Sequence, residues 1–151
     1  MRVLWIATIA SALLSIVSSF AAAALLERRI ALLGEFVGLQ LSYNSGVAFG
    51  MTLPEPWQTI LILCALACVI WMGWYAQNSF LQSGFGLIIG GALGNLFDRW
   101  GDALVTDYIQ VKMFSTFNVA DTCISIGFAL LLLTPLCTVG PLSARKKGRR
   151  T

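Results

Sequence analysis

Residues 3–26 read VLWIATIASALLSIVSSFAAAALL, an uncharged run of 24 residues. A helix needs about 20 apolar residues to cross a hydrocarbon core of about 30 Å, so the run predicts a membrane-spanning helix. A cleaved signal peptide is the alternative, because Ala21–Ala24 resembles a small-residue cleavage site. Signal peptides have apolar regions of only about 7–15 residues, so an uncleaved helix is favoured.

Three further apolar runs lie at residues 57–75, 79–97 and 119–139, and Asp121 is the one charged residue within them. The composition agrees with this pattern, because 58% of the 151 residues are hydrophobic and 11% are charged. Soluble domains carry about a quarter charged residues. We therefore predict an α-helical integral membrane protein, a single domain over residues 1–151 with four transmembrane helices.

The placement of lysine and arginine predicts the orientation of these helices. Five basic residues lie within 145–150, whereas segments 27–56 and 98–118 each carry three acidic residues and two basic ones. Cytoplasmic segments are enriched in Lys and Arg, so both termini are expected in the cytoplasm, with a basic tail at 140–151. The net charge of +3 then reflects topology and anionic lipid. Nucleic acid is not an expected partner, because no aromatic residues interleave the basic run.

Two segments outside the predicted helices have the pattern of strands. Phe36–Tyr43 alternates apolar and small residues, and Asn44-Ser45-Gly46 then supplies a turn signal. Ala103–Val111 is the second candidate strand. We expect these segments to form a small β-sheet at the outer face of the membrane, with its apolar side toward lipid.

Asp107 and Asp121 are the most informative residues, because a carboxylate at the membrane edge is costly and needs a reason. The chain has no histidine, which excludes His-dependent acid–base catalysis. Two carboxylates that approach each other share a proton, so one can activate water while the other donates to a carbonyl. In the simpler alternative Asn118 and Asp121 only cap the last helix, and Asp107 is a surface acid.

The third apolar run has a glycine at every fourth position, Gly86, Gly90 and Gly94, which predicts close helix packing. Asn95 and Asp98 lie one helical turn apart at its outer end. The four cysteines have no metal-binding spacing and no histidine partners, so they are interpreted as packing residues. We expect no metal and no organic cofactor.

Four blocks of this sequence together resemble the lipoprotein signal peptidase family, also called signal peptidase II. They are NSGVAFG at 44–50, GGALGNLFDR at 90–99, VTDYI at 105–109 and FNVAD at 117–121. The blocks occur in the family order, and the resemblance spans about residues 35–130. Four blocks in order on a chain with four predicted helices are a specific signal, whereas one block would not be.

The resemblance implies an aspartic endopeptidase of the bacterial inner membrane with its active site at the periplasmic face. Such enzymes remove signal peptides from prolipoproteins, cutting before a cysteine that carries diacylglycerol. Asp107 and Asp121 match the catalytic pair, and Asp98 is interpreted as a structural ion-pair partner of Arg99. The residues implied to bind substrate or support the pair are Asn44, Gly91, Asn95, Arg99 and Asn118. The expected partners are a diacylglyceryl prolipoprotein and membrane lipid, and the chain is expected to be a monomer.

The first helix departs from the family pattern, which usually has an Asp there and a Lys four residues later. The corresponding stretch here is Ser15-Ile16-Val17-Ser18-Ser19, without charge. Two alternatives therefore stay open. One is a non-enzymatic small membrane protein, either a transporter subunit or a packing scaffold, whose acids are caps and ion pairs. The other is a divergent family member that binds prolipoprotein with little turnover.

Overall fold

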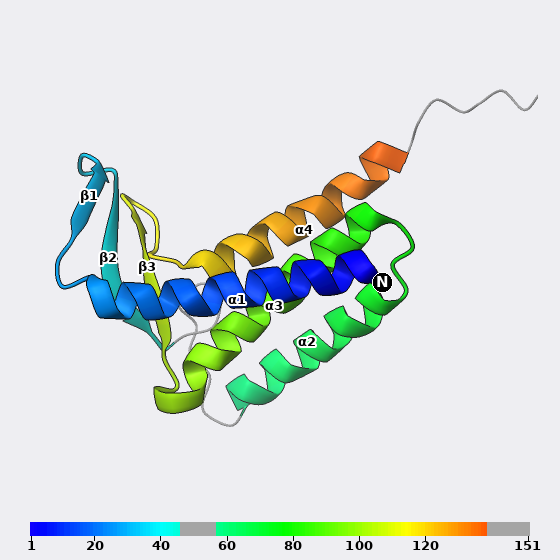
Figure 1. Cartoon of the computed structure of the whole chain (residues 1–151), viewed down its shortest axis with the longest axis horizontal. Coiled ribbons are helices and arrows are strands. Elements are labelled where there is room, and N and C mark those ends of the chain that lie inside the picture. The colour runs from blue at the N-terminus through cyan, green and yellow to red at the C-terminus, as the bar shows by residue number, and fades with distance from the viewer. Residues whose placement is uncertain (46–56, 139–151) are drawn as a thin grey trace, which may run out of the picture.

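A bundle of helices carries a small sheet at one end (Figure 1). The computed structural model describes residues 1–45 and 57–138 of the chain. Within these residues the helices are α1 (Arg2–Leu25), α2 (Trp57–Trp74), α3 (Ser79–Asp102) and α4 (Val119–Thr138). The strands are β1 (Ile30–Leu33), β2 (Val37–Asn44) and β3 (Val105–Val111). All four predicted helices are present at their predicted places.

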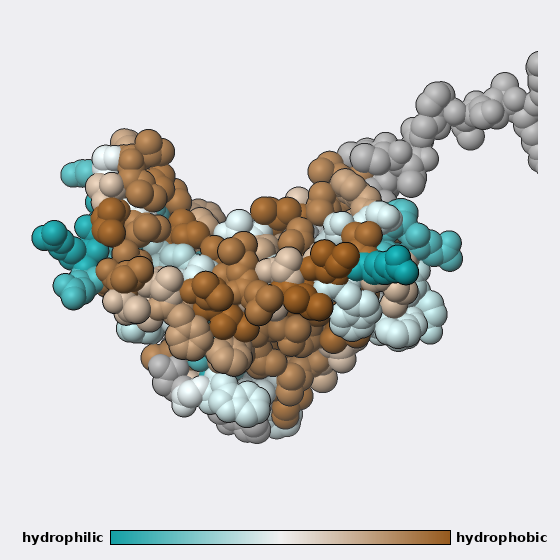
Figure 2. Space-filling model, in the orientation of Figure 1, coloured by the Kyte–Doolittle hydropathy of each residue, from teal (hydrophilic) through white to brown (hydrophobic). Residues whose placement is uncertain are grey.

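The lengths and composition of the helices fit a membrane protein. α1, α2 and residues 79–101 of α3 are each long and apolar enough to cross a membrane. α4 is apolar over the shorter span Val119–Leu133, so its full crossing stays a prediction. Apolar side chains cover much of the helical surface, and hydrophilic ones gather toward its two ends (Figure 2). The predicted class, an α-helical membrane protein with a small sheet, is confirmed.

The third helix extends beyond the apolar run at 79–97, and Asp98 lies on its outer end as predicted. α3 continues to Asp102 and ends at Ala103, which has a left-handed φ of 61°. The Ala103 amide closes the helix by donating to the carbonyl of Arg99 at 3.1 Å. The segment from residue 98 therefore begins within a helix, and Asn95, Asp98 and Arg99 all lie on its last turns.

Glycines let α3 pack closely against its neighbours, as predicted. A Cβ added at Gly86 would lie 2.6 Å from the carbonyl oxygen of Leu4, so α1 approaches the α3 backbone directly. A Cβ added at Gly127 on α4 would lie 2.6 Å from the carbonyl oxygen of Gly84. Close approach of this kind is how helices associate in lipid, where water exclusion does not drive them together. α3 is thus the central helix, with α1 and α4 packed against it.

The sheet is antiparallel with the strand order β1-β2-β3. The two predicted strands are confirmed as β2 and β3, and Ser42 pairs with Asp107 in their register. β1 was missed, because Ile30–Leu33 has no polar alternation and every one of its residues is exposed. The predicted turn after Asn44 extends into residue 46, outside the described residues.

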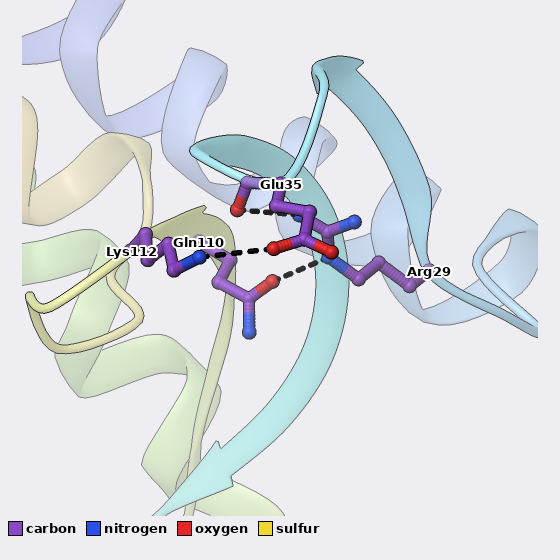
Figure 3. Close-up of polar contacts among 4 residues, drawn as sticks. All are labelled: Arg29, Glu35, Gln110 and Lys112. Atoms are coloured by element: carbon purple, nitrogen blue, oxygen red, sulfur yellow. Dashed lines mark hydrogen bonds and ion pairs between the residues drawn. The ribbon is translucent and has the colours of Figure 1, made fainter.

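A polar cluster joins the segment around the β1–β2 turn to the end of β3 (Figure 3). Arg29 donates from Nε to Oε1 of Gln110 at 2.6 Å and from Nη2 to the Glu35 carbonyl at 3.2 Å. Lys112 forms an ion pair with Glu35 at 2.9 Å. These contacts are exposed and contribute little to stability, but they tie the β1–β2 turn to β3.

Candidate active site

Asp107 lies on β3 with its side chain 2% exposed, although it is a carboxylic acid. β2 runs beside it, and Asn44 at the end of that strand donates from Nδ2 to Oδ2 of Asp107 at 3.1 Å. A buried carboxyl group needs such partners, because burial without hydrogen bonds is costly. The structure thus brings Asn44, which the family resemblance implied as a supporting residue, into contact with Asp107.

Asn118 and Asp121 form a reciprocal cap at the start of α4. The Asp121 amide donates to Oδ1 of Asn118 at 2.9 Å, and the Asn118 amide donates to Oδ2 of Asp121 at 3.3 Å. Each side chain thereby satisfies a backbone donor that the helix leaves free. The predicted cap is confirmed, and the positive end of the helix favours a carboxylate at Asp121.

The same asparagine also reaches the other carboxyl group. Nδ2 of Asn118 donates to Oδ1 of Asp107 and to Oδ1 of Asn95, at 3.0 Å each. Asn95 in turn donates from Nδ2 to Oδ1 of Asp121 at 2.8 Å. One chain of amide hydrogen bonds therefore runs from Asn44 through Asp107 to Asp121. Asn118 therefore caps α4 and also contacts the carboxyl group of Asp107, so its capping role does not exclude a role in holding the two carboxyl groups.

The surroundings raise the pKa of Asp107 from its ordinary value of 3.8 to about 6. Burial is the largest cause, because it disfavours the ionised form. The negative charge of Asp121 raises the pKa further, whereas the amides of Asn44 and Asn118 and the charge of Arg99 lower it. Asp107 thus retains its proton at a pH where an ordinary aspartate is ionised.

Three more of the predicted site residues lie on α3. A Cβ added at Gly91 would lie 2.5 Å from the carbonyl oxygen of Ala120, so this glycine sets the spacing between α3 and the start of α4. Asp98 accepts a hydrogen bond from the Thr106 amide at 2.8 Å, next to Asp107 in β3. The structural role of Asp98 is therefore to join α3 to β3, and its ion pair with Arg99 stays a prediction.

Two residues that sequence reasoning gave no role meet at the edge of this site. Tyr108 donates from its hydroxyl to Oγ of Ser18 on α1 at 2.7 Å, and it accepts a hydrogen bond from the Val119 amide at 3.3 Å. A phenol hydroxyl directly after Asp107 in the predicted strand was the available signal, because buried tyrosines usually pair their hydroxyl. The partner on α1 lies 90 positions away, and no local pattern identifies it.

The described residues contain no cluster of three or more acids or thiols arranged for a metal ion. Cys64 and Cys68 are exposed on α2, and Cys123 is buried in α4. The hydrogen-bond donors to the carboxyl groups of Asp107 and Asp121 are side-chain and backbone amides. Such groups orient carboxyl oxygens through hydrogen bonds.

The comparisons with known proteins agree on one family. A sequence profile described as "Signal peptidase (SPase) II" matches residues 6–137. The lipoprotein signal peptidase of Aquifex aeolicus is 41% identical over 108 residues, covering 65% of this chain and 65% of that protein. The lipoprotein signal peptidase of Coxiella burnetii (strain Dugway 5J108-111) is 37% identical over 114 residues, covering 68% of this chain and 70% of that protein.

Solved structures share the same fold. One, described as a bacterial membrane enzyme structure at 1.9 Å resolution, superposes with a TM-score of 0.77 at 23% identity. The superposition covers 87% of this chain and 90% of the other. A second, at 2.3 Å resolution, has a TM-score of 0.75 at 22% identity and covers 95% and 93%. With a family profile matched over residues 6–137 and relatives up to 41% identical, this chain belongs to the signal peptidase II family of peptidases.

Proposed function

We propose that this chain is a prolipoprotein signal peptidase that cleaves by water attack activated by Asp107 and Asp121. The observation that carries the proposal is the amide chain that holds two carboxyl groups from different elements in one network. The pKa of Asp107, raised to about 6 chiefly by burial and further by the negative charge of Asp121, supports Asp107 as the carboxyl group that holds the proton. The names of the relatives support prolipoproteins as the substrate class, and the family resemblance implies that these carry diacylglycerol.

In this mechanism the two carboxyl groups have different tasks. Asp107 keeps the proton and donates it to the carbonyl oxygen of the scissile peptide bond. Asp121, held by the Asn95 amide and the start of α4, accepts a proton from the attacking water. The water oxygen bonds to the carbonyl carbon and a tetrahedral intermediate forms. A proton then moves from Asp121 to the leaving nitrogen, the C–N bond breaks, and Asp107 regains its proton.

The distribution of charge supports a site at the membrane surface. Apart from Arg2, every charged residue in the described ranges falls within 27–35 or 98–121, the segments that make or adjoin the sheet. The lipid chains of a substrate can then stay in the bilayer while its peptide bond reaches the carboxyl pair. We infer an inner-membrane protein with both termini in the cytoplasm and the site on the periplasmic side. It acts as a monomer made of one peptidase domain.

The test uses purified protein with a diacylglyceryl prolipoprotein, followed by the size of the product. The wild type is expected to release the signal peptide, and Asp107→Asn and Asp121→Asn are each expected to lose activity by about 10²-fold or more. Glu35→Gln is the matched control, because Glu35 is an exposed carboxylate in the β1–β2 turn of the same sheet. Unchanged cleavage by either aspartate variant would overturn the mechanism. Binding of precursor without cleavage by the wild type would instead indicate a binding protein with little turnover.

A further inference from the structure

Tyr108 directly follows Asp107 in β3 and is 6% exposed. Its hydroxyl reaches two other elements, because it contacts Ser18 on α1 and the amide of Val119 at the start of α4. β3 carries one carboxyl group of the proposed pair and α4 carries the other. The Tyr108 hydroxyl therefore lies where the two elements that hold the pair meet α1.

The hydrogen bonds through this hydroxyl run in one direction. The Val119 amide donates to Oη of Tyr108 at 3.3 Å, and the Tyr108 hydroxyl donates to Oγ of Ser18 at 2.7 Å. Ser18 then donates to the carbonyl of Leu14 at 2.6 Å. Ser18 also donates to the carbonyl of Ser15 at 3.0 Å, so its hydroxyl hydrogen is shared between two carbonyls of α1 while its oxygen accepts from Tyr108. Burial also raises the pKa of Tyr108, which keeps its hydroxyl protonated and able to donate.

The contact with Val119 bears on the position of Asp121. Val119 is the first residue of α4, and its amide is one of the donors that a helix leaves free at its N-terminus. Asn118 satisfies the Asp121 amide, and Tyr108 satisfies the Val119 amide. The first turn of α4 is thereby fastened both to the cap residue and to the strand that holds Asp107.

We propose that Ser18 and Tyr108 are positioning residues that fix Asp107 relative to Asp121 by tying β3 and the start of α4 to α1. The inference rests on the proposed function of that pair. Neither residue touches the reacting atoms. The uncharged stretch Ser15–Ser19 of α1 thus contributes to the site through a hydroxyl group, with no charged side chain in that stretch.

Activity is compared among the wild type, Ser18→Ala, Tyr108→Phe and the double variant, with a diacylglyceryl prolipoprotein peptide as substrate. Ser18→Ala is expected to lower kcat by roughly three- to tenfold, the effect of one lost hydrogen bond, with KM within twofold. Tyr108→Phe is expected to lower kcat at least as much, because it also removes the acceptor of the Val119 amide. The double variant is expected to match Tyr108→Phe, because both changes remove the same bond. Ser18→Thr keeps the hydroxyl and is expected to restore kcat.

The pH profile separates positioning from a loss of folded protein. Looser packing of β3 admits water to Asp107, whose neighbouring charged groups are Asp121 on α4 and Arg99 on α3. The pH at which kcat/KM falls should therefore move down in Ser18→Ala and Tyr108→Phe. A smaller folded fraction leaves that pH unchanged. Tyr75→Phe and Ser83→Ala are the matched controls. Tyr75 is exposed, Ser83 donates only to the Ser79 carbonyl within α3, and both are remote in sequence from Asp107 and Asp121.

Amide hydrogen exchange tests the positioning role of Ser18 and Tyr108 without a measurement of enzyme activity. Exchange at residues 117–122 is expected to quicken at least threefold in Ser18→Ala and Tyr108→Phe, while exchange in α2 stays as in the wild type. Unchanged exchange, or a wild-type kcat and pH profile in both variants, would overturn the positioning role. If the wild type does not cleave the peptide but the variants exchange faster, the proposed function fails and the positioning role stands.

Discussion

Nδ2 of Asn118 lies 3.0 Å from Oδ1 of Asp107, and both side chains are at most 2% exposed. Asn118 is also the cap of α4, through its contact with the Asp121 amide at 2.9 Å. One residue therefore performs two tasks that are usually separate. It begins the helix that carries Asp121, and it orients the carboxyl group on the strand.

Replacement of Asn118 by alanine should harm stability and activity together. The loss of the cap costs about 1 kcal/mol. The unpaired carboxyl oxygen of Asp107 adds about 1–3 kcal/mol because it stays buried. Asn78→Ala is the matched control: Asn78 caps α3 through the Leu81 amide at 2.7 Å and does not contact the pair. Thermal unfolding in mild detergent should show the larger loss for Asn118→Ala, and kcat should fall only there. Equal losses in both variants would contradict the double role.

The pH dependence of cleavage should follow the proton on Asp107. This proton is needed on the carboxyl group that donates to the peptide carbonyl, so kcat/KM should fall as pH rises through about 6. Bound substrate excludes water and disfavours the ionised form further. The corresponding fall in kcat should therefore lie at a higher pH than the fall in kcat/KM. Activity that only rises from pH 5 to 8 would assign Asp107 the opposite task, that of the base.

Asn44→Ala should move that pH upward. The amide of Asn44 stabilises ionised Asp107 and is the largest of the causes that lower its pKa. Its removal raises the pKa of Asp107, so the fall in kcat/KM moves to higher pH. Asn95→Ala is the comparison, because the Asn95 amide contacts Asp121 rather than Asp107. An equal shift in both variants would contradict the assignment of one amide to each carboxyl group.

Much of the fold was predictable because lipid imposes simple rules on sequence. Runs of about 20 apolar residues have one common explanation in a membrane protein, so the helices were identified nearly to the residue. The apolar run at 79–97 marks only the part of the third helix that hydropathy reports. The apolar run ends before Asp98, the first charged residue after it. Hydropathy indicates where the lipid ends, but the helix itself continues to Asp102.

The site was only partly predictable. Asn118 and Asp121 are close in sequence, so their cap could be recognised from local spacing. Asn44 and Asp107 are 63 positions apart, and family motifs rather than local pattern placed them together. The hydrogen bond between Tyr108 and Ser18 was predictable neither from local spacing nor from the family motifs. It depends on the rotation of α1 against α3, which is set by the glycines of α3 and the small residues facing them.

Gly91→Ala should lower activity more than stability. The added methyl group would meet the Ala120 carbonyl, a backbone atom that moves only if the start of α4 moves. Because Ala120 precedes Asp121, we expect kcat to fall about tenfold or more, since small misplacements at a reacting centre are costly. Gly101→Ala is the matched control, since open space surrounds that position. Wild-type kcat in Gly91→Ala would show that the start of α4 tolerates displacement.

The buried carboxyl group of Asp107 should also make stability depend on pH. Its folded pKa of about 6 lies above the ordinary value of 3.8, so between these pH values the folded chain holds a proton that the unfolded chain has released. The free energy of unfolding must then fall as pH rises from about 4 to 6, by up to about 3 kcal/mol, and level off above pH 6.

Asp107→Asn removes this pH dependence of stability. The melting temperature of the wild type relative to Asp107→Asn should therefore drop between pH 4 and 6. A difference that instead rises with pH would mean that the folded protein prefers Asp107 ionised.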